Sequence, residues 1–178
     1  EYDDIINIAG FNYRMTELQA AVCRVQLGKL DGLNAARLKL VKQLNNGLRV
    51  FDFLVVPEEK YDCESTYYVY PLKFLSEIAG IKREQFVEAV NAEGINFFQG
   101  YVKPLYTQPV YQKRSLFKNG YPFSAIENKS CRMEYNIGIC PNAEKLYFDQ
   151  MIINEHIRLP NTEEDVRDII NAIHKIVT

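Results

Sequence analysis

Apolar residues recur at helical spacing between Thr16 and Gly47. Thr16 and Gln19 are spaced for a capping box, in which the threonine oxygen accepts a backbone N–H and the glutamine reaches back. Gly28 and Gly32 predict a break or kink between two helices. At the far end, Gly47 follows an asparagine and predicts a left-handed cap.

Strand and helix patterns alternate in the rest of the chain. Short apolar or β-branched runs predict strands at residues 51–56, 66–74, 95–98 and 151–157. Tyr67, Tyr68 and Tyr70 fit the second strand and are predicted to pack in the core. Helical spacing predicts helices at 82–93, at 141–148 and from Thr162 onward. This order predicts an α/β fold, an α+β sandwich with helices mostly on one face of a small sheet.

Composition narrows the possible partners and sites. The chain has 178 residues and a net charge of -2, which gives no general attraction to nucleic acid or to an anionic membrane. Its apolar runs are too short to span a bilayer. The four cysteines form no C-x-x-C pair and only two histidines are present, which argues against a metal site. We expect reduced cysteines that pack as small hydrophobes in a cytoplasmic protein.

Residue patterns alone give no catalytic constellation. His156 and His174 have no obvious nucleophile beside them, and no phosphate-binding glycine loop is present. The chain begins without a methionine, and we expect it to be a fragment of a longer protein.

Two segments carry polar groups that suit a ligand. In residues 10–21, Asn12 and Arg14 come just before the predicted helix N-terminus, a position suited to anions. Residues 100–111 fall in an irregular region, 99–135, which is rich in Tyr, Pro and Gly. Two prolines fix the backbone of residues 100–111, which offer three tyrosines, a lysine and a glutamine.

Four stretches resemble one family of enzymes. Residues 10–21 resemble the G-x-N-Y-R-M-T/S-E-x-Q-A-A motif of the DegT/StrS nucleotide-sugar aminotransferases, which depend on pyridoxal 5'-phosphate (PLP). The chain is similar to that family at three further motifs, P-L-H-x-Q-P-x-Y, C-P-x-A-E-x-L and L-P-x-T-E-E-D-V, at residues 104–111, 140–146 and 159–166. The matches occur in the family's order and cover most of the chain.

The resemblance implies an architecture. Members are homodimers of the aspartate-aminotransferase fold (type I PLP fold), with each active site at the subunit interface. Residues 1–15 would be the tail of the large PLP-binding domain, residues 16–47 the linking helices, and residues 48–178 the small C-terminal domain.

The resemblance also implies roles for single residues. Asn12 would bind the phosphate of the neighbouring subunit's PLP, and Arg14 would contact the sugar nucleotide or its phosphates. Tyr101, Tyr106 and Gln108 would line the sugar-nucleotide site, with Tyr106 where many members have histidine. The alternatives are a local cap or turn for Asn12 and Arg14, and packing against the sheet for Tyr106.

The implied activity is amino transfer from an amino acid, with glutamate as the expected donor, to a keto group of a nucleotide-linked sugar. In the family, the lysine that binds PLP lies upstream of the first motif, and no lysine here occupies its place. We therefore expect no catalytic residue in this chain and no activity from it alone. Two alternatives stay open: a sugar dehydratase of the same family, with histidine in place of that lysine, and a non-catalytic binding or oligomerisation module.

Overall fold

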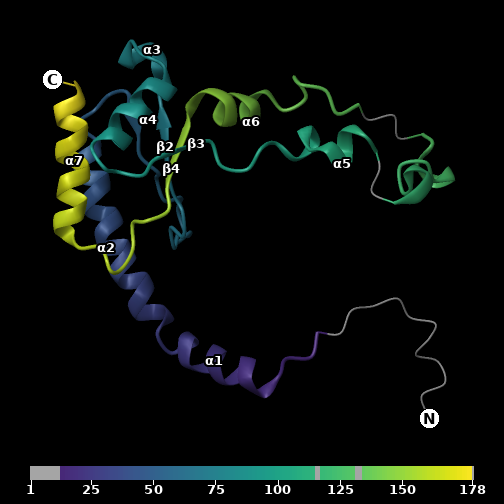
Figure 1. The fold of residues 1–178 in the computed structure, drawn as a ribbon, viewed down its shortest axis with the longest axis horizontal. Coiled ribbons are helices and arrows are strands. Elements are labelled where there is room, and N and C mark those ends of the chain that lie inside the picture. The colour runs from purple at the N-terminus through teal and green to yellow at the C-terminus, as the bar shows by residue number, and fades with distance from the viewer. Residues whose placement is uncertain (1–12, 115–116, 131–133, 178) are drawn as a thin grey trace.

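The structure is a computed structural model that describes residues 13–114, 117–130 and 134–177. A body of sheet and helices carries two extensions (Figure 1). On one side, α1 (Glu17–Leu27) and the first half of α2 (Leu30–Leu48) lead away from the body. On the other side, a long segment between β3 and β4 projects outward and returns.

Four strands form an antiparallel sheet in the order β1-β2-β4-β3. Their bounds are β1 (Leu54–Val55), β2 (Tyr70–Phe74), β3 (Phe98–Gln99) and β4 (Met151–Asn154). The central pair runs in register from Tyr70 opposite Asn154 to Lys73 opposite Met151. Alternate residues of β2 are buried from Tyr70 to Phe74, whereas Lys73 is exposed, so the two faces of the sheet differ in burial.

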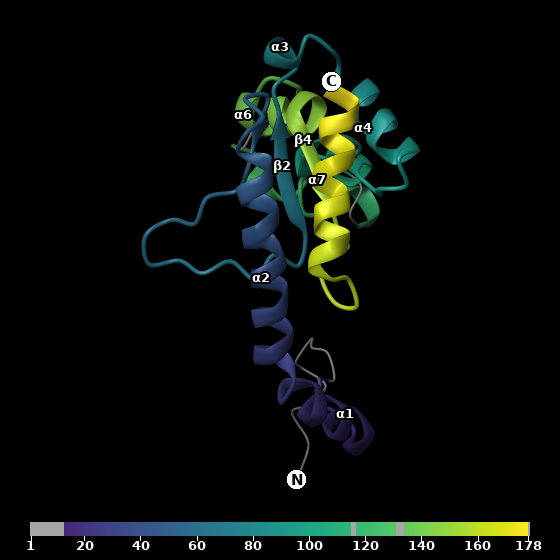
Figure 2. The same ribbon diagram turned by 90° about the vertical axis from the view of Figure 1, so that its left-hand side faces the viewer.

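Helices α2, α4 (Arg83–Ala92) and α7 (Glu163–Val177) cover one face of the sheet (Figure 2). Their apolar stripes meet the strands in one core that includes Leu44, Leu48, Tyr70, Leu72, Phe74, Phe86, Val90, Phe97, Ile152, Val166 and Ile173. Lys39 and Glu163 form an ion pair that joins α2 to the start of α7. Within the described residues, no helix has both the length and the apolar character that a membrane span requires.

The remaining elements are short. They are α3 (Ser76–Ala79), α5 (Pro109–Gln112), α6 (Pro141–Lys145), a π-helical turn (Leu146–Gln150) and 3-10 turns at Leu105–Thr107, Lys118–Gly120 and Ile126–Asn128. Most of them lie on the segment between β3 and β4, which contains the predicted irregular region, 99–135, and the helix predicted at 141–148. The predicted fold class, helices packed on a small sheet, is confirmed.

The start of the first helix is as the sequence predicts. The Gln19 backbone N–H donates to Thr16 Oγ1 at 3.3 Å, and the Thr16 N–H donates to Gln19 Oε1 at 2.9 Å. The break between the helices falls at Gly28 and the following lysine, whereas Gly32 lies inside α2.

The predicted left-handed cap at Gly47 is wrong. α2 continues through Gly47 and ends at Leu48. A Cβ on Gly47 would lie 2.7 Å from Cγ1 of Ile170 in α7. Glycine is therefore needed here for close packing of two helices and not for a turn.

The strands are shorter than predicted. The second one begins at Tyr70 because Tyr67 has a φ of 46°, a left-handed conformation that interrupts extended backbone. The expectation of packed cysteines is also wrong where it can be checked, since Cys23, Cys63 and Cys140 are free and exposed.

Candidate functional site

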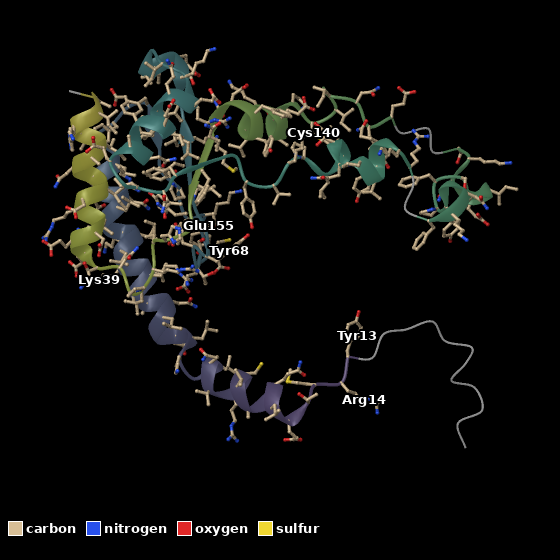
Figure 3. All side chains as sticks on the ribbon, in the orientation of Figure 1. Tyr13, Arg14, Lys39, Tyr68, Cys140 and Glu155 are labelled. Carbon is tan, nitrogen blue, oxygen red and sulfur yellow. The ribbon has the colours of Figure 1, made fainter. Side chains whose placement is uncertain are left out.

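The predicted site residues lie on separate parts of the chain (Figure 3). Asn12 lies outside the described residues. Arg14 is exposed just before α1 (Figure 3), whereas Tyr101, Tyr106 and Gln108 follow β3 in the sequence. α1 and that segment stand apart in both ribbon views, so one chain does not bring Arg14 to the tyrosines.

Tyr106 is buried and ties two motifs together. Its hydroxyl donates to the carboxylate of Glu144, which lies 38 residues away in α6. The same carboxylate accepts the backbone N–H of Gly138 at 2.8 Å and that of Cys140 at 3.3 Å. Gln112 donates its side-chain amide to the Tyr106 carbonyl at 2.6 Å. The Pro-Leu-Tyr motif and the Cys-Pro-x-Ala-Glu motif therefore form one hydrogen-bonded unit.

These contacts set the protonation of the pair. The hydrogen bond from Tyr106, with further bonds from the N–H groups of Gly138 and Cys140, lowers the pKa of Glu144 below its ordinary value. Burial and the neighbouring Glu144 raise the pKa of Tyr106 to about 12. At neutral pH the phenol is therefore the donor and the carboxylate the acceptor.

Gln108 lies at the junction of two short helical turns. Its carbonyl accepts the backbone N–H of Tyr111 at 3.0 Å and that of Gln112 at 3.1 Å. Pro109 follows as the first residue of α5, where its missing N–H is not needed. The Gln108 side chain is half-buried. The prolines thus fix the backbone of this segment, as the sequence predicts.

Tyr101 is paired with Tyr68, a residue that sequence reasoning missed. The two hydroxyls are 2.7 Å apart, and the two ring centroids are 6.5 Å apart with the planes at 73°. Tyr68 is 65% exposed and Tyr101 is 47% exposed. The prediction that Tyr68 packs in the core is therefore wrong, whereas Tyr67 and Tyr70 are buried as predicted.

Two left-handed residues bring Tyr68 and Tyr101 together. Tyr67 has a φ of 46°, and its side chain stays buried while the next residue turns outward. Gly100 has a φ of 64°, and a Cβ there would lie 2.9 Å from the ring of Tyr147. A left-handed tyrosine costs about 1–3 kcal/mol, whereas one hydrogen bond contributes about 0.5–1.5 kcal/mol. The tyrosine pair does not by itself offset the cost of the backbone that presents it.

Arg83 is a second residue that sequence reasoning missed. It is buried at the start of α4 and donates to the carbonyls of Tyr147 at 2.8 Å, Phe148 at 2.7 Å and Met151 at 3.3 Å. These bonds fix the turn through which the segment re-enters the sheet at β4. A single arginine at the start of a helical pattern resembles a solvated residue, so the sequence offers no signal for this role.

The described residues also bear on cofactor binding. The exposed guanidinium of Arg14, just before the capped N-terminus of α1, has the chemistry to hold a phosphate. Among the residues that the structure describes, no group of three or more His, Cys, Asp or Glu could hold a metal ion. These residues fit a single phosphate contact.

Comparison with known proteins identifies the family. The sequence profile of the DegT/DnrJ/EryC1/StrS aminotransferase family matches residues 2–174, which include both predicted ligand segments. The chain belongs to the DegT/DnrJ/EryC1/StrS aminotransferase family. The family resemblance seen in the sequence motifs is thus confirmed.

Individual relatives in this family are distant. A putative L-glutamine:3-amino-2,3-dideoxy-scyllo-inosose aminotransferase of Micromonospora echinospora is 28% identical over 172 residues, which cover 95% of this chain and 40% of that protein. The fold is similar to that of DesV from S. venezuelae, with a TM-score of 0.72 and 20% identity over 96% of this chain and 38% of DesV. It is also similar to the PLP form of Spr1654, a putative sugar aminotransferase from Streptococcus pneumoniae, with a TM-score of 0.63 and 18% identity over 92% of this chain and 36% of Spr1654.

The lengths of these family members matter for function. The chain spans about 40% of the length of the curated relatives that it matches.

Proposed function

We propose that this chain is the C-terminal part of a PLP-dependent aminotransferase. The whole enzyme transfers an amino group from an amino acid, with glutamate as the donor, to a keto group of a nucleotide-linked sugar. The family match over residues 2–174 supports this proposal, because it includes both the Asn-Tyr-Arg segment (residues 12–14) and the proline-framed loop (residues 100–111). Bound PLP supplies the electron sink for amino transfer.

The chain contributes binding groups from two places. Asn12 holds the phosphate of the neighbouring subunit's PLP, and Arg14 contacts the phosphates of the sugar nucleotide. The separation of α1 from the segment that follows β3 within one chain supports a homodimer whose active site is shared across the interface. In this proposal residues 1–15 end the large domain, residues 16–47 link the domains and residues 48–178 form the small domain.

The proline-framed loop forms the substrate side of the site. Tyr101 offers an exposed side chain, and Gln108, further along the same loop, offers a half-buried amide. The Tyr106 proton is donated to Glu144, so the phenol oxygen is the group of Tyr106 that can still accept a bond from the substrate. Through this hydrogen bond, Glu144 fixes the position of the Tyr106 phenol relative to the substrate.

The chain alone is proposed to be inactive, because in this family the PLP-binding lysine lies upstream of the first motif. The full-length enzyme is proposed to act in the cytoplasm, with a nucleotide sugar and an amino acid as its small-molecule partners.

Amino transfer by the full-length protein tests the proposal. The protein is incubated with PLP, a nucleotide-linked keto sugar and glutamate that carries ¹⁵N at its α-amino group, or with α-amino-labelled glutamine because one relative is named for that donor. We expect ¹⁵N in the sugar nucleotide by mass spectrometry, with an equal amount of the donor's keto acid, 2-oxoglutarate from glutamate or 2-oxoglutaramate from glutamine. Loss of water from the sugar without nitrogen incorporation would favour the dehydratase, and no reaction with either donor would contradict the proposal.

A substitution in the same protein tests the role of Asn12. Asn12→Ala removes a charge-assisted hydrogen bond, so we expect PLP retention to weaken by about 1.5–3 kcal/mol. Dialysis followed by cofactor absorbance measures the retained PLP. Asn142→Ala, an exposed asparagine in α6, is the matched control and should retain PLP as the wild type does. Equal retention in the two variants would refute the role of Asn12.

A further inference from the structure

The exposed tyrosine pair adds Tyr68 and Glu155 to the proposed sugar-nucleotide site, to which the family resemblance assigns only Tyr101 of the three. We propose that Tyr68 and Tyr101, with Glu155 beside them, bind the hydroxyl groups of the substrate's sugar ring. The identity of the ligand as a nucleotide-linked sugar rests on the proposed function. The ligand chemistry, a ring with several hydroxyl groups and an apolar edge, follows from the side chains themselves.

The hydrogen bond between the two tyrosines leaves one O–H donor and several oxygen lone pairs available to a ligand. One phenol donates to the other across 2.7 Å, so the accepting phenol keeps its own O–H for a further partner. Both oxygens keep lone pairs that can accept a sugar hydroxyl. Donation within the pair polarises the second O–H and strengthens it as a donor.

The two rings offer a matching apolar surface. Their planes meet at 73°, so one ring presents an edge to the face of the other. Both side chains are largely exposed, with Tyr68 at 65% and Tyr101 at 47%. Exposed aromatic faces with polar tips suit ligands that are apolar on one side and hydroxylated on the other.

Glu155 completes the cluster with a negative charge. It is exposed directly after β4, whose last residue, Asn154, pairs with Tyr70 of β2 close to Tyr68 in sequence. The hydrogen bond to Tyr68, burial and the charges of Tyr68 and Glu155 together raise the pKa of Tyr101, in keeping with a carboxylate close to the pair. An ionised carboxylate accepts hydrogen bonds only, so it complements the donor hydroxyls of a sugar.

The backbone also supports a binding role. Tyr68 and Tyr101 are each preceded by a left-handed residue, Tyr67 and Gly100, and both turns direct the pair away from the packed layer. Sparsely populated backbone conformations gather at ligand sites. A pair that served only to hold the segment would not need two exposed aromatic rings.

Saturation-transfer NMR on the 178-residue chain tests the site without cofactor or turnover. UDP-glucose is the probe, and UDP without the hexose is the comparison. We expect saturation of the wild-type protein to reach the hexose ring protons. In Tyr68→Phe and in Tyr101→Phe, we expect the affinity for UDP-glucose, obtained by titration of the hexose signals, to fall about fivefold to tenfold.

Three further variants sharpen the test. The double variant should lose no more affinity than either single variant, because the two hydroxyls act as one unit. Tyr61→Phe, a fully exposed tyrosine at 100%, is the matched control and should bind as the wild type does. Glu155→Gln keeps the shape and removes the charge, so it should weaken the hexose signals without changing those of UDP.

Several results would overturn the site. Absence of transfer to the hexose protons of the wild type is one, and unchanged hexose affinity in both Phe variants is another. If the Phe variants only speed hydrogen exchange at residues 101–103, the pair is a structural contact and the proposal is wrong. Failure of amino transfer in the full-length protein would remove the proposed function and leave this binding result standing.

Discussion

At the residue scale, one carboxylate connects the proline-framed loop (residues 100–111) to the start of α6. Glu144 accepts the Tyr106 hydroxyl and the N–H groups of Gly138 and Cys140. The motif around Glu144 is readable in the sequence, but its partner is not, because the two residues are 38 positions apart and meet only in the folded segment. Tyr68 illustrates the same limit, since a tyrosine in an apolar run looks like core until the left-handed Tyr67 turns it outward.

Acid should weaken the contact between Tyr106 and Glu144. The pKa of Glu144 is lowered in the folded chain, so its contribution is present above the ordinary value of 4.5 and is lost as pH falls through the lowered value. We expect Glu144→Gln to be less stable than the wild type at neutral pH and to lose less stability on acidification. Thermal unfolding between about pH 7 and about pH 3 measures this. Glu127→Gln, an exposed glutamate of the same segment, is the control, and a parallel pH dependence of the wild type and Glu144→Gln would contradict the expectation.

The Tyr106 phenol can be tested in the full-length enzyme. Tyr106→Phe removes the hydroxyl and keeps the ring, so if Tyr106 contacts the sugar, KM for the sugar nucleotide rises while the half-reaction with the amino acid is unchanged. Tyr106→His should be tolerated. A lower thermal stability with unchanged sugar kinetics would instead show that Tyr106 acts only through Glu144.

At the element scale, helix type and position follow from periodicity, whereas ends and contacts depend on packing. The capping box at Thr16 is local and was predictable. Glycine after asparagine commonly caps a helix, yet α7 packs against Gly47 through Ile170 and the helix continues past it. The strands are shorter than predicted for a similar reason, since hydrogen-bonded pairing with a neighbouring strand, and not β-propensity, decides where each strand ends.

Two glycines of α2 provide a matched comparison. Gly47→Ala gains helix propensity but drives a Cβ into Ile170, a stiff β-branched side chain, and we expect a net loss of about 1 kcal/mol. Gly32→Ala meets nothing within 4 Å and should stabilise the chain by up to about 1 kcal/mol. Chemical denaturation measures both changes, and Ile170→Val should recover part of the loss at Gly47. A stabilising Gly47→Ala would mean that Ile170 moves aside without cost.

At the scale of the whole molecule, α1 and the segment between β3 and β4 extend from one body (Figure 1). None of the residues of α1 is buried, and even its apolar side chains Leu18, Val22 and Val25 are exposed. An eleven-residue helix with no packed face is marginal in water, so its apolar side is suited to a partner surface. The family and the fold class could be predicted from the motifs, but the placement of the two extensions could not, because few core contacts fix it.

The proposed function predicts that the lysine that binds PLP lies outside residues 1–178. Borohydride is added to PLP mixed with the full-length protein and, separately, with the 178-residue chain, and peptides are mapped by mass spectrometry. We expect stoichiometric labelling of one lysine in the full-length protein at a position outside this chain, and only weak, scattered labelling of the chain alone. Stoichiometric labelling of a single lysine within residues 1–178 would contradict the account.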